Sequence, residues 1–210
     1  MHTAKIKLIG GKIEYFTKQD IEKGDKHLSL NDIKTYGEVF RVAECICKRL
    51  DVDLPGIILT PDLSEKWGYT FFKKDNFLLT DNIVALRVED GMDRYLFTGN
   101  LAHEIRHIWQ SYYNPSLVKK TYKKPGEDLL CPAEIDADGF ALWYLAADKK
   151  DKPACFKKMA EEIVFPRYIV LSLGSKFISS YEQGLDLRIK KAEEIDAEYR
   201  KYHSFIPIKE

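Results

Sequence analysis

The 210-residue chain contains no apolar run of about 18 residues or more, so no transmembrane helix is expected. Its first residues, Met1 to Lys7, include no apolar stretch of the kind that signal peptides carry. Neither sign of charge is in excess, because 33 basic residues balance 33 acidic ones. There is therefore no global electrostatic case for binding nucleic acid or an anionic membrane. These absences predict a cytoplasmic protein whose partners are neither nucleic acid nor membrane.

Cysteine is scarce, with Cys45, Cys47, Cys131 and Cys155 the four in the chain. In the cytoplasm these residues are expected to be reduced thiols. Cys45 and Cys47 stand two apart on a predicted helix and face different ways, which argues against a zinc knuckle. Cys131 stands three residues before Glu134, so a rival metal ligand and an inhibitory thiolate remain open for it. Buried or inert thiols are the expectation for all four, because a free cysteine mostly behaves as a small hydrophobe.

Apolar content of 45% supports a packed core, and its periodicity predicts an α+β fold. Two short strands are expected within residues 5–16, around Gly10-Gly11. Further strands are expected at 56–60, 68–73, 77–80 and 83–88. Helices are expected at 30–50, from Met92 or Asp93 to 113, and at 132–147. Helical segments are expected in most of 154–203, with breaks near Pro166 and Gly174 and a last helix after Gly184.

Residues 101–110, LAHEIRHIWQ, contain the pattern H-E-x-x-H. On a helix, His103 and His107 lie on one face, one turn apart, which lets both imidazoles bind one Zn²⁺. Glu104 lies beside them, off the metal, where a carboxylate can take a proton from a bound water. The apolar stripe of this helix follows the opposite face: Leu101, Ile105, Ile108, Trp109 and Tyr112. The histidine face is therefore expected to line a cleft; the alternative is an ordinary amphipathic helix with two surface histidines.

A second motif offers a third ligand. Residues 131–142, CPAEIDADGFAL, indicate the start of a helix, because proline suits the first turn and acidic residues favour its positive end. Glu134 is expected to be the third zinc ligand. Asp138, one turn later, is expected to accept the free N–H of a ligating histidine. The alternative is that both acids serve only the N-terminus of the helix.

The two motifs together, H-E-x-x-H followed by E-x-x-A-[ND]-x-F-A, resemble the gluzincin-type zinc metalloproteases, and in particular the compact ImmA/IrrE-like group. The resemblance covers roughly residues 55–147, and the matching residues are His103, Glu104, His107, Glu134, Ala137, Asp138, Phe140 and Ala141. It implies zinc held by His103, His107 and Glu134, with Glu104 as general base and peptide bonds as the substrate. Family members often carry glycine before the second histidine, where this chain has Arg106. No G-x-x-H follows His107, so the metzincin pattern is absent.

We therefore expect residues 1–150 to form a zincin-like metalloprotease domain, with a small mixed sheet packed against the H-E-x-x-H helix. Residues 151–210 are expected to form a helical extension packed on that domain. The expected activity is zinc-dependent hydrolysis of peptide bonds in a specific intracellular protein, with the strand beside the cleft pairing with an extended peptide. One alternative is a non-catalytic zinc-binding module in which a loop or Cys131 closes the coordination site. Another is a sensor or anti-repressor whose C-terminal helices bind a partner.

The sequence leaves two further features to be considered, the oxyanion donor and the lysine-rich connection. Peptide hydrolysis needs a hydrogen-bond donor for the oxyanion besides the metal, and the donors near the motifs are Tyr112, Tyr113, Tyr144 and Arg106. None of these is favoured over the others. The connection 114–131 carries Lys119, Lys120, Lys123 and Lys124. A solvated loop is expected there rather than a site for acidic substrates, because charge runs usually face water.

Overall fold

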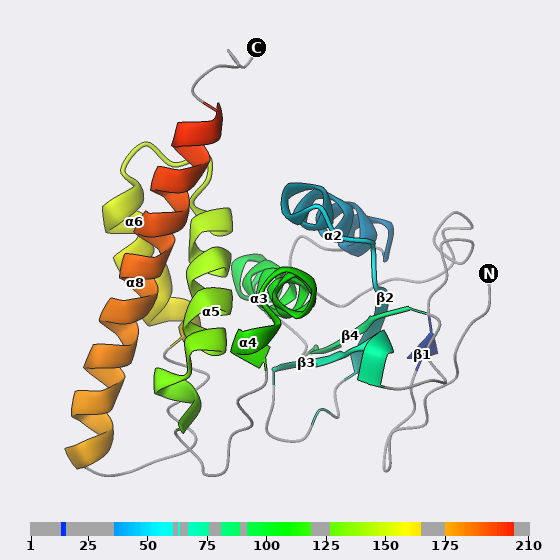
Figure 1. Cartoon of the computed structure of the whole chain (residues 1–210), viewed down its shortest axis with the longest axis horizontal. Helices are drawn as coiled ribbons and strands as arrows, with labels where there is room; N and C mark the ends of the chain where they lie inside the picture. Colours follow the sequence, from blue (N-terminus) through cyan, green and yellow to red (C-terminus); the bar gives the residue numbers. More distant parts are fainter. Residues whose placement is uncertain are drawn as a thin grey trace. The chain divides into compact units, whose positions relative to one another are not determined.

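The computed structural model describes residues 14–15, 36–60, 63, 67–75, 81–88, 92–118, 127–164 and 175–203. The chain divides into two compact units, Met1–Lys119 and Lys120–Glu210 (Figure 1). The predicted α+β class is confirmed, because the first unit combines a sheet with helices and the described part of the second is helical. The predicted domain boundary at residue 150 stays a prediction. No helix in the described ranges combines the length and the apolarity that crossing a bilayer requires.

The first unit contains a four-stranded mixed sheet in the order β1-β2-β4-β3. Its strands are β1 (Glu14–Tyr15), β2 (Gly56–Thr60), β3 (Gly68–Phe71) and β4 (Ile83–Arg87). β2 and β4 are parallel, whereas β1 pairs antiparallel with β2 and β3 pairs antiparallel with β4. The sequence placed β2 and β4 within one residue of these bounds. β3 ends earlier than predicted because Lys73–Asp75 form a 3₁₀ turn, and the predictions for 5–13 and 77–80 lie outside the described residues.

Both faces of this sheet carry buried apolar side chains. The register puts one set on the face that also carries Thr70: Ile57, Leu59, Val84 and Leu86. The opposite face has a cluster made of Ile58, Leu63, Ile83 and Ala85, with Phe71 packed against it. Ile83 to Leu86 are all buried, and a strand buried on both faces reads as a continuous apolar run in the sequence. This explains why the run I-V-A-L does not alternate.

The helices of the first unit are α2 (Tyr36–Leu50), α3 (Arg94–Tyr113) and the short α4 (Pro115–Val118). α3 packs against β3, β4 and α2, and Figure 1 shows α2 and α3 on the same side of the sheet. The Asp93 carboxylate caps α3 by accepting from the backbone N–H groups of Tyr95 (2.7 Å) and Leu96 (3.3 Å). The predicted start of the H-E-x-x-H helix is thereby confirmed. Of the helix predicted at 30–50, residues 30–35 lie outside the described residues.

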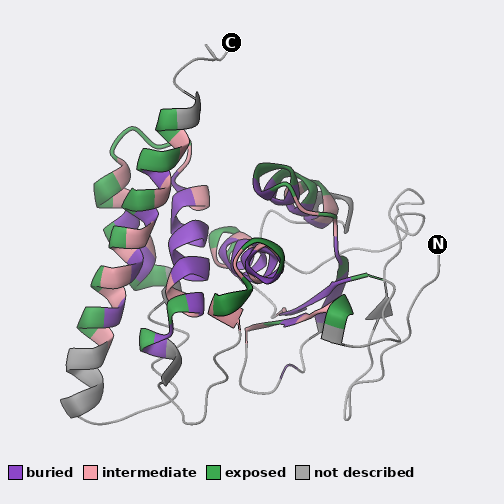
Figure 2. Ribbon diagram, viewed as in Figure 1, coloured by how far each residue is buried: buried purple, intermediate pink, exposed green. Residues whose placement is uncertain are grey.

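The burial of α3 differs from the predicted amphipathic pattern (Figure 2). Leu101, Ile105 and Ile108 are fully buried, as the apolar stripe requires, but Tyr112 is 53% exposed. His103 and Glu104 are also buried, at 3% and 6% exposure. Part of the reason is that β3 covers the side of α3 that carries Glu104, and a helix packed on a sheet and on a second helix has little free surface. The alternative of two surface histidines is therefore wrong for His103.

The second unit consists of helices in its described part. They are the 3₁₀ helix η2 (Glu127–Leu130), α5 (Pro132–Leu145), α6 (Lys152–Met159), a π-helical turn (Ala160–Val164) and α8 (Ser175–His203). α5 and α8 lie side by side (Figure 1). Gly139 permits their close approach, because a Cβ on it would lie 2.7 Å from Lys191 Cβ. Trp143 on α5 donates to Asp196 on α8 (3.2 Å), which adds a polar link to this packing.

The prediction that a last helix begins after Gly184 is wrong, because α8 is continuous from Ser175 to His203. Glycine costs helix stability, roughly 1 kcal/mol relative to alanine, and for that reason suggested a break. In this structure Gly184 allows α8 to approach the backbone of η2 closely. A Cβ on Gly184 would lie 2.9 Å from the carbonyl oxygen of Leu129, and the Gly184 carbonyl accepts from Arg188 Nη1 (2.9 Å).

All four cysteines are free thiols. Cys47 and Cys131 are buried as predicted, whereas Cys45 is exposed and Cys155 half-buried. Burial, together with the neighbouring Asp53 and Glu44, raises the pKa of the Cys47 thiol to about 12. Because the thiolate is the reactive form, Cys47 is inert at neutral pH.

Candidate metal centre

Two histidine side chains of α3 converge on one point. Nε2 of His103 lies 3.0 Å from Nε2 of His107, and the two rings meet nearly at right angles, at 87°. Their spacing of one helical turn produces this geometry. Two nitrogens bound to one tetrahedral zinc ion, each about 2.0–2.1 Å from it, lie about 3.3 Å apart. The pair therefore fits a shared ion after a displacement of a few tenths of an ångström.

The other ring nitrogen of His107 is held within the same helix. Nδ1 of His107 lies 2.9 Å from Oε1 of Gln110, and the Gln110 side chain is fully buried. A hydrogen bond at Nδ1 fixes the plane of the imidazole and so directs Nε2. This contact was not predicted, although Gln110 follows His107 at the i+3 spacing that puts helical side chains in reach of one another.

Glu104 is held by the neighbouring strand β3. Thr70 Oγ1 lies 2.8 Å from Glu104 Oε2 and 2.9 Å from the Glu104 carbonyl oxygen, so its hydroxyl has two acceptors in reach. Gly68, two residues earlier on the same face of β3, leaves room for the other carboxylate oxygen. A Cβ on Gly68 would lie 2.4 Å from Glu104 Oε1. The strand thus fits around the carboxylate of Glu104 and orients it.

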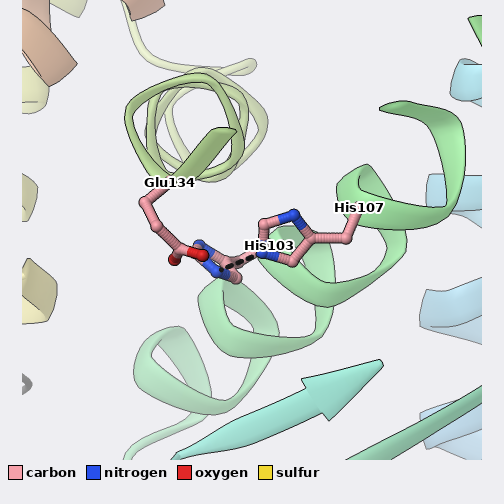
Figure 3. A group of neighbouring side chains, drawn as sticks. All are labelled: His103, His107 and Glu134. Atoms are coloured by element: carbon pink, nitrogen blue, oxygen red, sulfur yellow. Dashed lines mark hydrogen bonds between the residues drawn. The ribbon is translucent and has the colours of Figure 1, made fainter. Parts of the chain in front are cut away.

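The third predicted ligand lies at the start of α5. Cys131 occupies the N-cap position with extended backbone, Pro132 stands in the first turn, and Glu134 follows in that turn. The possible ligand atoms of His103, His107 and Glu134 all lie within 4.8 Å of one another (Figure 3). Two imidazoles and a carboxylate are a donor set that zinc accepts. Among the described residues, this is the group of histidine, cysteine and acidic side chains that has metal-ligand spacing.

Asp138 has a strong partner within its own unit. Its Oδ2 accepts from Arg188 Nε at 2.6 Å, and both side chains are almost fully buried. The free N–H of a ligating histidine is the partner that the sequence predicts for Asp138, and that role stays a prediction. Asp138 thus forms a buried ion pair with Arg188. The sequence did not indicate this pair, because the two residues are fifty positions apart.

Several residues considered from sequence are engaged elsewhere. The Tyr113 hydroxyl donates to the Asp51 carbonyl (3.1 Å), and the Arg106 guanidinium stacks on Trp109, 3.6 Å from the ring centroid. The Tyr112 hydroxyl accepts from Asn82 Nδ2 (2.9 Å). Cys131 is buried but does not belong to the ligand group in the described part of the chain. The oxyanion donor therefore stays unassigned, and the lysines at 119–124 lie outside the described residues.

The chain has no significant match among models of protein families, among curated proteins, or among solved structures. The features that bear on function are two converging imidazoles, an adjacent oriented carboxylate, and a second carboxylate at the start of a helix.

Proposed function

We propose that His103, His107 and Glu134 bind a zinc ion in a zincin-like fold, and that the protein hydrolyses peptide bonds. The observation that carries the proposal is the 3.0 Å approach of the two histidine Nε2 atoms, next to a Glu104 carboxylate oriented by Thr70. A helix with two exposed, unrelated histidines would have neither feature. Glu134 belongs to the other unit, so its share in the site needs a test of its own.

A bound zinc ion would supply the Lewis acidity that makes water a nucleophile near neutral pH. Glu104 then acts as the general base: its carboxylate accepts a proton from the attacking water and delivers it to the leaving amine. Thr70 keeps Oε2 of that carboxylate in a fixed place by donating to it. Because the carboxylate is already oriented, less conformational entropy is lost when the substrate binds.

The edge of β3 supports a peptide as the substrate. The Arg87 N–H donates to the Trp67 carbonyl at 2.9 Å, so residues 67, 69 and 71 form the hydrogen-bonded pairs with β4. The backbone N–H and C=O groups of Gly68 and Thr70 consequently point to the opposite side, where no described strand pairs with them. The Thr70 side chain faces Glu104, and a Cβ added to Gly68 would face it too. An extended peptide that pairs with this edge would therefore run beside the general base.

The first test is the metal content of protein purified without chelators, measured by elemental mass spectrometry. About one zinc per chain is expected, and a His103→Ala, His107→Ala double variant should contain none. Cys45→Ser is the control, because Cys45 is the exposed thiol and the proposal gives it no role. Glu134→Ala should weaken zinc binding in a competition titration. A parent that takes up no zinc when zinc is supplied refutes the proposed function, and an unchanged affinity in Glu134→Ala removes only the third ligand.

Gly68→Ala should retain zinc and lose about 100-fold in peptide hydrolysis. The added Cβ would lie 2.4 Å from Glu104 Oε1, so the carboxylate has to move, and a displacement of about 1 Å at a reacting group can cost about 10²-fold in rate. Gly56→Ala on β2 is the matched control, because its Cβ would lie 3.5 Å from Ile83 Cγ1, an ordinary contact. Equal rates for the two variants would show that the position of Glu104 does not limit the reaction.

A non-catalytic zinc module is the second candidate function, favoured by the burial of His103 and Glu104. A structural zinc site is closed by a fourth protein ligand, whereas a catalytic site keeps one position open. The two are distinguished by incubating the zinc-loaded parent with a peptide library of mixed sequence and searching for new termini by mass spectrometry. Loss of zinc in Cys131→Ser together with no cleavage by the parent would favour the module.

A further inference from the structure

Arg188 on α8 binds two segments that enclose the start of α5. Its Nε donates to Asp138 Oδ2 (2.6 Å), and its Nη1 donates to the Leu129 carbonyl (2.6 Å). Leu129 lies in η2, just before the N-cap of α5, whereas Asp138 lies one turn after Glu134. A guanidinium is planar and rigid, so these two contacts fix the carbonyl of η2 and the carboxylate of α5 relative to each other. All four residues belong to the second unit.

The start of α5 is capped differently from the starts of α3 and α6. Cys131 is its N-cap residue, and the thiol makes no capping hydrogen bond to the described residues of the first turn. In α3 and α6 the carboxylates of Asp93 and Asp151 accept from backbone N–H groups. The first turn of α5 is closed by the Ile135 N–H, which donates to the Cys131 carbonyl (2.9 Å). The turn that carries Glu134 therefore relies more on contacts from outside its helix than the first turns of α3 and α6 do.

Gly184 gives α8 the close approach that the Arg188 contacts need. A Cβ at this position would lie 2.9 Å from the Leu129 carbonyl oxygen and 3.2 Å from Arg188 Nη1. The Gly184 carbonyl itself accepts from the same Nη1 (2.9 Å). One buried donor is thus shared by the backbones of α8 and η2. Such a network holds one arrangement, because a displacement would leave buried polar atoms without their hydrogen bonds.

We propose that α8 controls the zinc affinity of the site, with Arg188 as the positioning residue that holds the first turn of α5 and so places Glu134. The inference rests on the proposed function, in which Glu134 is the third ligand. Coupling between two sites is reciprocal. A contact that strengthens zinc binding is therefore strengthened by zinc in return, and zinc should slow the hydrogen exchange of backbone amides around Gly184 and Arg188.

Zinc dissociation constants from a competition titration test the coupling as a double-mutant cycle. Arg188→Met should raise the constant by about 10-fold, within the range found for residues that support a metal ligand. In a Glu134→Ala background the same substitution should change it by less than about 2-fold, because the ligand through which Arg188 acts is gone. Trp143→Phe is the matched control, since it removes a buried hydrogen bond to Asp196 from the same α5–α8 interface, farther along α5 from Glu134.

Gly184→Ala disturbs the same contact without removing a charge, and alanine favours a helix more than glycine does. The zinc dissociation constant should rise here as well, because the new Cβ displaces the η2 carbonyl. A second measurement needs no metal: the Ile135 amide should exchange faster with solvent in both variants. The Cys155 amide, which closes the first turn of α6 by donating to the Asp151 carbonyl (3.1 Å), should change less. Circular dichroism shows whether each variant is folded.

The outcomes separate this inference from the proposed function. If the parent binds no zinc, the proposed function fails and the zinc coupling fails with it, while faster exchange at Ile135 would still show that α8 holds the start of α5. If the parent binds zinc and neither Arg188→Met nor Gly184→Ala changes the affinity, only the inference is overturned. Equal losses with and without Glu134→Ala, or a loss in Trp143→Phe as large as in Arg188→Met, would indicate general packing and overturn the positioning role.

Discussion

Glu104→Gln is expected to bind zinc as the parent does and to lose peptide hydrolysis by a factor of about 10²–10⁴, the usual contribution of a general base. An amide cannot take the proton of the attacking water. The replacement has nearly the same shape, and its oxygen can still accept from the Thr70 hydroxyl that now bonds Glu104 Oε2. The two proposed zinc ligands, His103 and His107, are untouched, so the loss should appear in the turnover and not in the metal content.

The measurement compares zinc-loaded parent and variant on the same mixed peptide library, with zinc content determined for each sample. Glu44→Gln is the matched control, because it makes the same chemical change on the exposed side of α2. Cleavage by Glu104→Gln at the parental rate would show that Glu104 is not the base. Loss of zinc in this variant would instead mean that Glu104 contributes to binding, contrary to its assigned place off the metal.

Arg188→Met is expected to destabilise the protein by about 3–5 kcal/mol, the cost of removing one partner of a buried ion pair. Arg188 is fully buried and its partner Asp138 is 2% exposed, with 2.6 Å between Nε and Oδ2. The same guanidinium donates through Nη1 to the carbonyls of Leu129 (2.6 Å) and Gly184 (2.9 Å). The substitution leaves a buried carboxylate and two buried carbonyls without this donor, and none of them regains water.

Urea unfolding followed by circular dichroism measures the change in stability. Arg200→Met is the control on the same helix: Arg200 also pairs with an aspartate, but its side chain is 69% exposed, so a loss below about 1 kcal/mol is expected. The double variant Asp138→Leu, Arg188→Met should recover part of the stability, because it removes the buried carboxylate as well. An Arg188→Met protein as stable as the Arg200→Met control would contradict the importance of this pair.

This ion pair also bears on the proposed metal site. Asp138 stands one turn after Glu134 on α5, and Leu129 lies in η2, just before the Cys131 cap of that helix. Arg188 therefore ties α8 to two points that flank the first turn of α5, where Glu134 is found. If Arg188→Met binds zinc less tightly while still folded, the C-terminal helix contributes to the placement of the third ligand.

Much of the fold was predictable because it depends on neighbours in the chain. Short apolar runs located β2 and β4, and Asp93 marked the start of α3 as an N-cap. The convergence of His103 and His107 follows from the rise of a helix, which puts residues four apart on one face. The Gln110 contact with His107 has the same local origin and was missed because glutamine is a weaker signal than an acidic residue.

Tertiary structure decided the features that depend on which surfaces meet. Thr70 reaches Glu104 across 34 positions of sequence, and Arg188 reaches Asp138 across 50. Neither pair has a sequence signal, because a threonine in a strand and an arginine in a helix are ordinary residues until a neighbour is packed against them. The order of the strands, which leaves β3 at an edge beside Glu104, is likewise a result of long-range pairing.

The sequence by itself determined the α+β class, the helix that carries H-E-x-x-H and the helix start that carries Glu134. These follow from local periodicity, caps and turn residues. Only the tertiary structure decided that Gly184 lies within a continuous helix, that His103 is buried, and that a strand holds Glu104 in place. The physical reason is common to all three: each depends on a contact between segments distant in the chain, and such contacts are selected by the packing of whole surfaces.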